Sequence, residues 1–294
     1  MRVIHIACVA PPQIGGIGQV AAFEVAQLRA RGIDASLVSP TTQRFFWHFG
    51  NAAALDLRPI MEDVRNADIV HLHYPFYGTA GIVAQLRKRG VITRLVVTLH
   101  MDATARGLKG FYFDLHRRVA QSRILKMADA LLVSSLDYAR HSSFASLADR
   151  CYELPFGVDE KRFAPYLTPS PLSFIRRGGS VLFVGGMDTA HAFKGVEVVL
   201  RAMTQMSQNV TLTLVGDGNL RHGYEKFART LGISSRVKFL GRVSDAELPD
   251  VYRSADVFAF PSSSDAEAFG LAALEAQSSG VPVVASDLPG VRTV

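Results

Sequence analysis

The chain alternates short apolar runs with amphipathic segments over almost its whole length, and this alternation restricts its fold more than any other feature. In the first half, apolar runs such as 3–9, 68–73 and 94–99 predict strands, and segments 20–30 and 79–89 predict the helices between them. Strands that alternate with helices form a parallel, doubly wound sheet, because each helix returns the chain to the same end of the sheet. The sequence therefore predicts an α/β fold.

A segment rich in Pro, Ser and Gly, residues 164–179, interrupts the alternation. The strand–helix order restarts at residue 180 and continues to a strand at 282–285. We therefore predict two Rossmann-like domains, residues 1–165 and 166–294, with ligands at the carboxyl ends of their strands and a cleft between the domains.

The composition is that of an ordinary globular protein, with 48% hydrophobic and 20% charged residues. No apolar run reaches the roughly 18–20 residues that a membrane span needs, and the first residues fit a strand better than a signal peptide. Cys8 and Cys151 both fall in predicted strands, far apart in the sequence. We expect two buried thiols in a reducing compartment, which predicts a cytoplasmic protein.

The basic excess is confined to the first half of the chain. Residues 1–165 hold 20 Lys and Arg against 14 Asp and Glu, which accounts for the whole net charge of +6. A basic half can bind an anionic acceptor, a membrane surface or nucleic acid, or can simply keep the protein soluble. No nucleic-acid recognition motif accompanies it, so we predict no nucleic-acid partner.

The segment 105–127 interleaves Phe and Tyr with Lys and Arg, as in the run LKGFYFDLHRR. A basic amphipathic helix with aromatic residues can lie on an anionic membrane, and an ordinary helix that buries its aromatic side has the same pattern. Because the segment belongs to the basic domain, an anionic membrane surface and a lipid-linked acceptor are candidate partners.

The stretch PSSSDAEAFGLAALEA, residues 261–276, carries most of the functional information. Glu267 and Glu275 are eight residues apart in it, which on one helix corresponds to about 80° of rotation and roughly 12 Å of rise. The backbone N–H groups of Phe269, Gly270 and Leu271 would lie at a helix N-terminus, where a phosphate group binds well. Two carboxylates on either side of an anion site suit a nucleotide-sugar, although two glutamates on a helix are more often a solvated face.

This run resembles the E-x7-E signature of glycosyltransferase family 4, whose members are retaining enzymes of the GT-B fold. Ala268 stands where many members have Gly, and the similarity continues through GVPVVASDLPG at 280–290. The resemblance implies that Glu267 positions the transferred sugar and that Glu275 binds the ribose of the donor. Family members continue beyond the point that corresponds to residue 294, so the second domain is expected to be incomplete.

A strand-turn-helix run, SVLFVGGMDTAHAFKG, resembles the part of the family that binds the donor diphosphate. Lys194 matches the family's lysine, whereas Gly186 stands where Arg is expected. A lysine is a point charge without the bidentate fork of arginine, and His191 or Arg242 could compensate. An ordinary lysine at a helix start is the alternative for Lys194.

Two further segments match the family's donor site. Gly15 and Gly16 precede the first helix in PPQIGGIGQV, in a turn where backbone amides can approach phosphates. A dinucleotide fold would instead need a third Gly, at Ala21, and an acidic residue about twenty positions later; both are absent. Val243 follows a strand at 236–240, where the family's backbone meets the nucleobase.

His100 ends the strand 94–99 in VVTLHMD, where the resemblance implies a histidine that contacts the transferred sugar and stabilises positive charge at its anomeric carbon. A structural role is the alternative for a single histidine. His71 and His73 alternate on a strand, and we interpret them as structural or as acceptor-side residues because no third metal ligand is evident.

Taken together, the resemblance implies a metal-independent hexosyltransferase that moves a sugar from a nucleoside diphosphate-sugar to a glycan or lipid-linked acceptor, in bacterial surface polysaccharide or glycolipid synthesis. The site residues are His100, Glu267 and Lys194 for catalysis, with Gly15, Gly16, Gly186, Lys194, Val243, Phe269, Gly270, Leu271 and Glu275 for the donor. No cofactor and no metal ligand are expected, since no D-x-D loop follows a suitable strand. The alternatives are a nucleotide-sugar epimerase of the same fold and a non-catalytic sugar-nucleotide-binding protein.

Overall fold

The computed structural model describes residues 1–8, 10, 15–39, 57–76, 79–102, 121–166 and 178–294, and every structural statement below concerns these residues. They divide into two compact units, Met1–Phe156 and Gly157–Val294. The division falls before the boundary predicted after residue 165. Phe163 explains the difference, because its ring is buried in the core of the second unit, 5.9 Å from the ring of Tyr252.

The first unit alternates strands with helices in the predicted order. Its elements are β1 (Arg2–Ile6), α1 (Gly16–Ala30), β2 (Asp34–Val38), η1 (Arg58–Ile60), α2 (Met61–Arg65), β3 (Ile69–Tyr74), α3 (Thr79–Lys88), β4 (Leu95–Leu99), α5 (Ser122–Met127), β5 (Ala130–Val133), α6 (Leu136–His141), η3 (Ala145–Arg150) and β6 (Cys151–Glu153).

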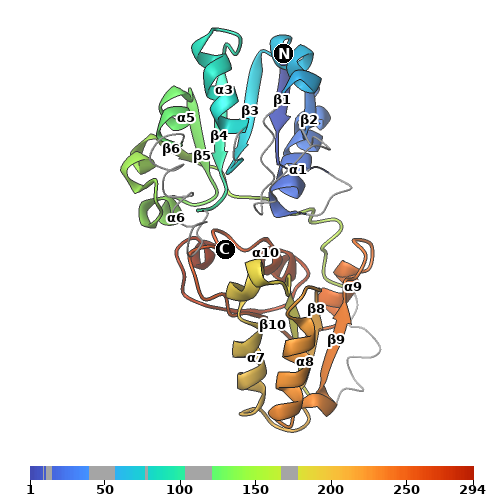
Figure 1. Ribbon diagram of the computed structural model, residues 1–294. Helices are drawn as coiled ribbons and strands as arrows, with labels where there is room; N and C mark the ends of the chain where they lie inside the picture. Colours follow the sequence, from blue (N-terminus) through green and yellow to red (C-terminus); the bar gives the residue numbers. More distant parts are fainter. Residues whose placement is uncertain (9, 11–14, 40–56, 77–78, 103–120, 167–177) are drawn as a thin grey trace. The chain divides into compact units, whose positions relative to one another are not determined.

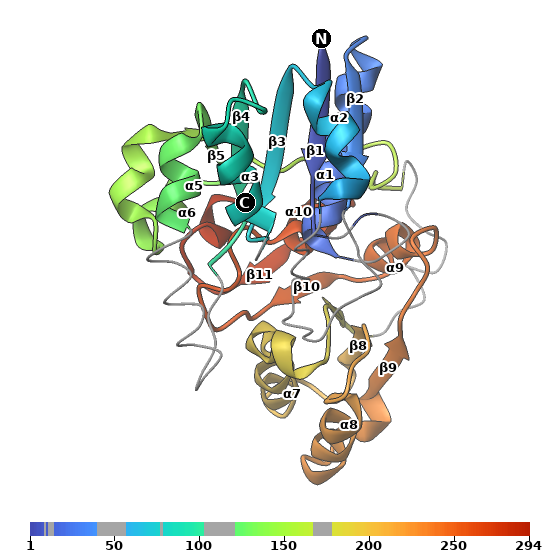
Figure 2. The same cartoon turned by 45° about the horizontal axis from the view of Figure 1, so that its top comes forward.

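The sheet of the first unit is parallel throughout, with the strand order β2-β1-β3-β4-β5-β6, which runs from right to left in Figure 1. The order changes direction between β1 and β3, the position where doubly wound sheets bind ligands at their carboxyl ends. Helix α1 covers β1 and β2, since Val25 packs between Val3 and Ala35, and Figure 2 shows α1 beside these strands.

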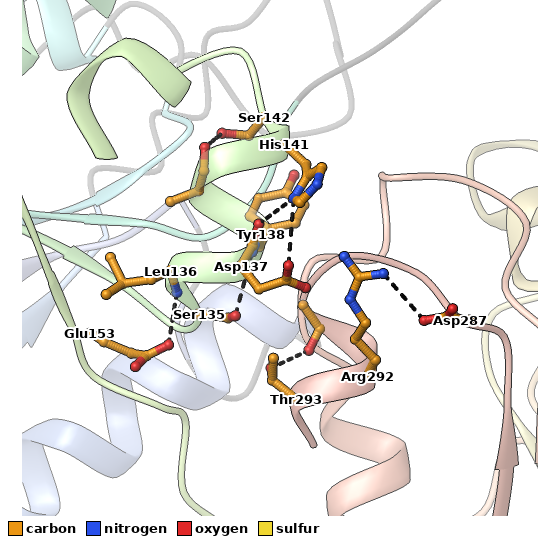
Figure 3. Close-up of polar contacts among 12 residues, drawn as sticks. Ser135, Leu136, Asp137, Tyr138, His141, Ser142, Glu153, Asp287, Arg292 and Thr293 are labelled. Atoms are coloured by element: carbon orange, nitrogen blue, oxygen red, sulfur yellow. Dashed lines mark hydrogen bonds and ion pairs between the residues drawn. The ribbon is translucent and has the colours of Figure 1, made fainter. Parts of the chain in front are cut away.

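Local hydrogen bonds set the limits of α6 (Figure 3). Ser135 caps its first turn, because its Oγ accepts from the backbone N–H of Tyr138 at 3.4 Å, and Glu153 Oε1 accepts from the N–H of Leu136 at 2.8 Å. The helix is shorter than the predicted segment 136–148. It ends at His141, because the carboxylate of Asp102 accepts from the backbone N–H of Ser143 at 2.7 Å and draws the chain out of the helix.

The second unit repeats the alternation. Its elements are β7 (Ser180–Val184), η4 (Thr189–Lys194), α7 (Val196–Met203), β8 (Thr211–Val215), α8 (Arg221–Thr230), η5 (Ser234–Arg236), β9 (Val237–Gly241), α9 (Leu248–Arg253), β10 (Val257–Phe260), α10 (Leu271–Ser278), β11 (Val283–Ala285) and η6 (Val291–Thr293).

The sheet of the second unit is also parallel, with the order β11-β10-β7-β8-β9, and both of its faces are covered. Phe183 belongs to a core that includes α7 and α8, whereas its neighbour Leu182 belongs to a core that includes α9 and α10. Successive residues of a strand point to opposite faces, so one apolar strand supplies both cores. After the last strand, Asp287 and Arg292 form an ion pair at 3.3 Å (Figure 3). The predicted pair of Rossmann-like sheets is thus confirmed.

Candidate functional site

The strand order of the second sheet changes direction between the parallel strands β7 and β10, so the segments that follow these two strands lie at its expected ligand site. The segment after β7 carries the two glycines Gly185 and Gly186 and leads into η4, which ends at Lys194. The segment after β10 carries Glu267. The sequence placed charged candidates on both segments, and the strand order makes the segments neighbours.

Lys194 and Glu267 form an ion pair in this place. Lys194 Nζ donates to Glu267 Oε2 at 2.7 Å, and the two side chains are only 18% and 12% exposed. The hydroxyl of Ser262 donates to the same oxygen at 3.0 Å. The rings of Phe193 and Phe260 lie 5.6 and 5.7 Å from the ammonium nitrogen. A largely desolvated pair of this kind has a definite position, because its charges attract strongly and aromatic rings restrict the lysine.

A glycine after Lys194 lets the two segments approach. Gly195 has a φ of +80°, and a Cβ on it would lie 2.1 Å from the carbonyl oxygen of Pro261. Gly185 is restricted as well, because a Cβ there would lie 2.8 Å from Lys194 Cδ. The glycines on this segment therefore bring the lysine against the β10 segment.

Gly186, the position where arginine is expected, lies under a histidine ring. A Cβ on Gly186 would meet His191 Cγ and Nδ1, each at 3.0 Å. His191 Nδ1 is 2.8 Å from Asp188 Oδ2, and the carboxylate of Asp188 also caps the start of η4. The imidazole thus lies directly over the position from which an arginine side chain would extend.

Glu267 does not belong to the helix that carries Glu275, so the one-helix geometry expected from their spacing is wrong. Helix α10 begins at Leu271, after Gly270, whose φ of 99° reverses the chain and whose Cβ would lie 2.9 Å from Phe260 Cε1. Phe269 is buried beside it. Gly270 and Leu271 still form the start of a helix, where backbone N–H groups lack carbonyl partners one turn earlier.

Glu275 projects from the middle of α10 and is bound to an aromatic hydroxyl. Tyr252 on α9 donates its hydroxyl proton to Glu275 Oε2 at 2.8 Å. Burial raises the pKa of Glu275, and the bond from Tyr252 and the charge of Arg162 offset part of that increase. Because Tyr252 is 23 positions away, the sequence offered no sign of this contact.

The remaining donor candidates are Val243, Gly15 and Gly16. Val243 follows β9 and packs, half-buried, against the α9–α10 core. Gly15 has an extended backbone with a φ of 176°, and a Cβ on Gly16 would meet nothing within 4 Å. Gly15 precedes α1 and Gly16 is its first residue, and among the described residues no steric contact requires a glycine at position 16. Most of the basic aromatic segment, residues 103–120, lies outside the described residues.

In the first unit, His100 follows β4 and is buried, with 5% of its surface exposed. Its ring stacks on Phe156 with 5.0 Å between ring centres, and its Nε2 lies 2.8 Å from Nδ1 of His73. Burial lowers the pKa of His100 to about 3, so its imidazole is neutral at ordinary pH.

A chain of histidines continues from His100 across the sheet. His73 Nε2 is 2.9 Å from His5 Nδ1, and His71 Nε2 is 2.7 Å from the hydroxyl of Thr98. Sequence analysis singled out His71 and His73 but missed His5, whose position on β1 directly opposite His71 follows only from the strand pairing.

Two parallel Rossmann-like sheets in one chain, with acidic and basic groups at the switch point of the second, define the GT-B class of fold. Solved structures agree, each with low sequence identity. The match to sucrose-phosphate synthase from Thermosynechococcus elongatus covers 100% of this chain and 83% of the chain of that protein, with a TM-score of 0.77 and 22% sequence identity. The match to HepE from Anabaena in complex with UDP covers 100% of this chain and 82% of the chain of that protein, with a TM-score of 0.73 and 20% sequence identity.

The chain belongs to the family 4-like glycosyltransferases. Family models described as "Glycosyl transferases group 1" and "Glycosyl transferase 4-like domain" match residues 179–294 and 44–150. Phosphatidyl-myo-inositol mannosyltransferase from Mycobacterium tuberculosis is 31% identical over 230 residues, which are 77% of this chain and 56% of the relative. D-inositol 3-phosphate glycosyltransferase from Xylanimonas cellulosilytica is also 31% identical, with 77% and 57% covered. The chain thus spans little more than half the length of these relatives.

Proposed function

We propose that this chain is a retaining glycosyltransferase that moves a hexose from a nucleoside diphosphate-sugar to a glycan or lipid-linked acceptor. The observation that carries the proposal is the largely buried pair of Lys194 and Glu267 at the switch point of the second sheet, with Glu275 on the helix that follows. In our assignment, Gly15, Gly16, Gly186, Val243, Phe269, Gly270 and Leu271 surround the donor.

Lys194 and the first amides of α10 bind the diphosphate. The ammonium group stabilises negative charge as it develops on the leaving diphosphate, and the helix N-terminus adds its partial positive charge. Glu267 holds the lysine in position before the reaction, so little reorganisation is needed. No metal ion takes part in this step of the proposal.

The two carboxylates bind the sugar rings of the donor. Glu267 accepts hydrogen bonds from hydroxyls of the transferred hexose, with the oxygen that Lys194 and Ser262 do not occupy. Glu275 accepts from the ribose hydroxyls, with the oxygen that Tyr252 leaves open. A carboxylate has about four acceptor positions, so both residues can keep their protein contacts while they bind sugar.

His100 contacts the transferred sugar as a neutral imidazole. A protonated ring would oppose the positive charge that develops at the anomeric carbon, and burial prevents protonation. The acceptor hydroxyl attacks from the face that the diphosphate leaves, its oxygen forms the new bond to the anomeric carbon, and its proton passes to a diphosphate oxygen. The anomeric configuration is retained.

The acceptor class to test first follows from the relatives, which are named for phosphatidyl-myo-inositol and D-inositol 3-phosphate. Lipid-linked inositol would place the enzyme at the cytoplasmic face of a membrane, in glycolipid or surface polysaccharide synthesis. Among the described residues, no helix has both the length and the apolar character needed to cross a membrane.

The experiment has two stages. UDP-, GDP- and ADP-sugars are screened for thermal stabilisation of the chain, because a bound donor raises the melting temperature. The stabilising donor is then incubated with phosphatidylinositol, inositol phosphate or a membrane extract, and the product's anomeric configuration is determined by NMR. Retained configuration, with no stimulation by added Mg²⁺ or Mn²⁺, supports the proposal; inversion contradicts it.

A second candidate, sugar-nucleotide binding without transfer, is favoured by Gly186. At this position the family's arginine would give a planar, bidentate contact to phosphate, and His191 offers at most one donor. Donor binding by calorimetry, with no transfer to any acceptor tested, would support this candidate. An epimerase would change the nucleotide-sugar itself when no acceptor is present. Analysis of the products formed without an acceptor therefore separates an epimerase from the transferase and from the binding protein.

A further inference from the structure

Three histidines and a glutamate of the first unit form a compact cluster of candidate ligand atoms. They are His5 on β1, His71 and His73 on β3, and Glu24 on α1, and the four candidate ligand atoms all lie within 4.8 Å of one another. His73 also contacts His100, a residue used in the proposed transfer reaction, at 2.8 Å.

The sheet and the first helix bring the four residues together. His5 pairs directly with His71 across the parallel strands, and His73 follows two residues later on the same face. Val25 packs on that same face, since it contacts Val3 and Ala35. Its neighbour Glu24 therefore reaches over the histidines from α1.

The contacts of Glu24 with the three histidines are longer than hydrogen bonds. Glu24 Oε2 lies 3.6 Å from His5 Nδ1, 3.7 Å from His71 Nδ1 and 3.8 Å from His73 Nε2. The carboxylate is thus nearly equidistant from three nitrogens and at hydrogen-bonding distance from none of them. A carboxylate that stabilised one histidine by a hydrogen bond would approach that ring more closely.

His5 is buried in the cluster and contacts His73 through one ring nitrogen. It is 1% exposed, and its Nε2 has no hydrogen-bond partner among the described residues. Its Nδ1 faces His73 Nε2 at 2.9 Å, where a single proton can be shared. An ion bound to Nδ1 would replace the proton shared with His73 and would fix the His5 proton on Nε2.

The cluster is about the size of the ligand set of a small tetrahedral ion. Zinc binds histidine nitrogen at about 2.0–2.1 Å, which separates ligands in a tetrahedron by roughly 3.3–3.4 Å. The measured separations of 2.9, 3.6, 3.7 and 3.8 Å lie on both sides of that value. Imidazole nitrogens favour Zn²⁺ or Co²⁺, whereas Mg²⁺ and Ca²⁺ require oxygen ligands.

We propose that His5, Glu24, His71 and His73 form a binding site for one divalent transition-metal ion of the Zn²⁺ class. His5 and His71 bind through Nδ1, His73 binds through Nε2, and Glu24 supplies an oxygen that offsets part of the ion's charge. The side chain of Glu24 is 19% exposed, so the cluster reaches the surface at this carboxylate. The proposal does not depend on the proposed transferase activity.

The other nitrogens of two ligands already have partners, as in known metal sites. His71 Nε2 donates to the hydroxyl of Thr98 at 2.7 Å. With the metal on its Nε2, His73 carries its proton on Nδ1 and donates to His100 Nε2 at 2.8 Å. The ion therefore determines which nitrogen of His100 carries a proton.

Cobalt titration of the chelator-treated chain tests the site. Co²⁺ in a tetrahedral site gives intense visible absorption, and we expect saturation at one ion per chain, with full displacement by Zn²⁺ and none by Mg²⁺. His71→Ala and Glu24→Gln should weaken binding by more than the 10–100-fold typical of residues that only support a ligand, and Thr98→Val by about 10–100-fold.

The control is His222→Ala, which removes an 87% exposed histidine from the second unit and should bind as the wild type does. Circular dichroism establishes that each variant is folded. A wild-type chain that shows no saturable tetrahedral spectrum overturns the proposal, whether or not the variants fold. Unchanged affinity in folded His71→Ala and Glu24→Gln overturns it as well, because cobalt would then be bound elsewhere.

Discussion

Lys194 and Glu267, 73 positions apart in the sequence, meet at 2.7 Å at the switch point of the second sheet. Sequence analysis gave each a separate role, the lysine at the diphosphate and the glutamate at the sugar. Their contact makes them one unit: the carboxylate determines where the ammonium charge is placed, and the ammonium reduces the cost of burying the carboxylate.

The pair should behave as a coupled unit in a double-mutant cycle. Lys194→Met leaves a largely buried carboxylate without its cation. We expect the free energy of unfolding to fall by about 2 kcal/mol, which is less than the 3–5 kcal/mol lost when a fully buried pair is broken. Adding Glu267→Gln should recover part of that loss. Urea unfolding of the four proteins measures the coupling, and strictly additive effects would show that the contact is energetically unimportant.

Lys194→Met should also lower kcat by about 10²–10³-fold.

Gly195→Ala should be more destabilising than an ordinary substitution of a left-handed glycine. The new Cβ would lie 2.1 Å from the Pro261 carbonyl oxygen, so the Lys194 segment must move away from the β10 segment. Gly232→Ala is the matched control, because Gly232 has a similar φ of +71° with nothing within 4 Å of its Cβ position. Gly232→Ala should lower the free energy of unfolding by about 1–2 kcal/mol, and Gly195→Ala should lower it by clearly more. Equal melting temperatures would mean that the close approach is easily relieved.

Glu275→Gln should stabilise the chain increasingly as the pH rises. Burial raises the pKa of Glu275 in the folded state above its unfolded value, so the folded state holds this proton more tightly. The resulting stabilisation is complete below the unfolded pKa, near 4, and is lost as the pH rises through the folded pKa. Glutamine has no such dependence. The difference in melting temperature, variant minus wild type, should therefore increase from pH 4 to pH 8, and a constant difference would contradict the shift.

The same variant should bind the donor more weakly. Hydrogen bonds from ribose hydroxyls to a carboxylate are stronger than those to an amide, and their loss should reduce donor affinity roughly 10–100-fold. Isothermal titration calorimetry with the stabilising donor measures the change. If affinity is unchanged while the stability gain is present, Glu275 has a structural role only.

His100→Ala should lower turnover with little effect on donor affinity. A residue that acts on charge developing at the anomeric carbon contributes in the transition state and not in the ground state, so kcat and kcat/KM should fall together. Steady-state kinetics with varied donor concentration separate the two parameters. Equal turnover in wild type and variant would remove the catalytic assignment of His100.

The motifs of the second half predicted the candidate site residues but did not give their geometry. The run 261–276 suggested one helix with two aligned glutamates. The φ of 99° at Gly270 instead separates Glu267 in a loop from Glu275 on α10. A glycine followed by a helical pattern is compatible with both arrangements, and in the structure a Cβ at position 270 would lie 2.9 Å from Phe260 Cε1.

The amino-acid sequence by itself determined the order of strands and helices, the two Rossmann-like sheets and the family, because periodicity, turn residues and motifs are local. Only the tertiary structure decided that Lys194 is paired with Glu267, that Tyr252 binds Glu275, and that His5 and Glu24 join His71 and His73. Each of these contacts depends on which strands become neighbours, in what register, and which face a helix covers. Such contacts arise from the packing of the whole sheet, and no local pattern encodes them.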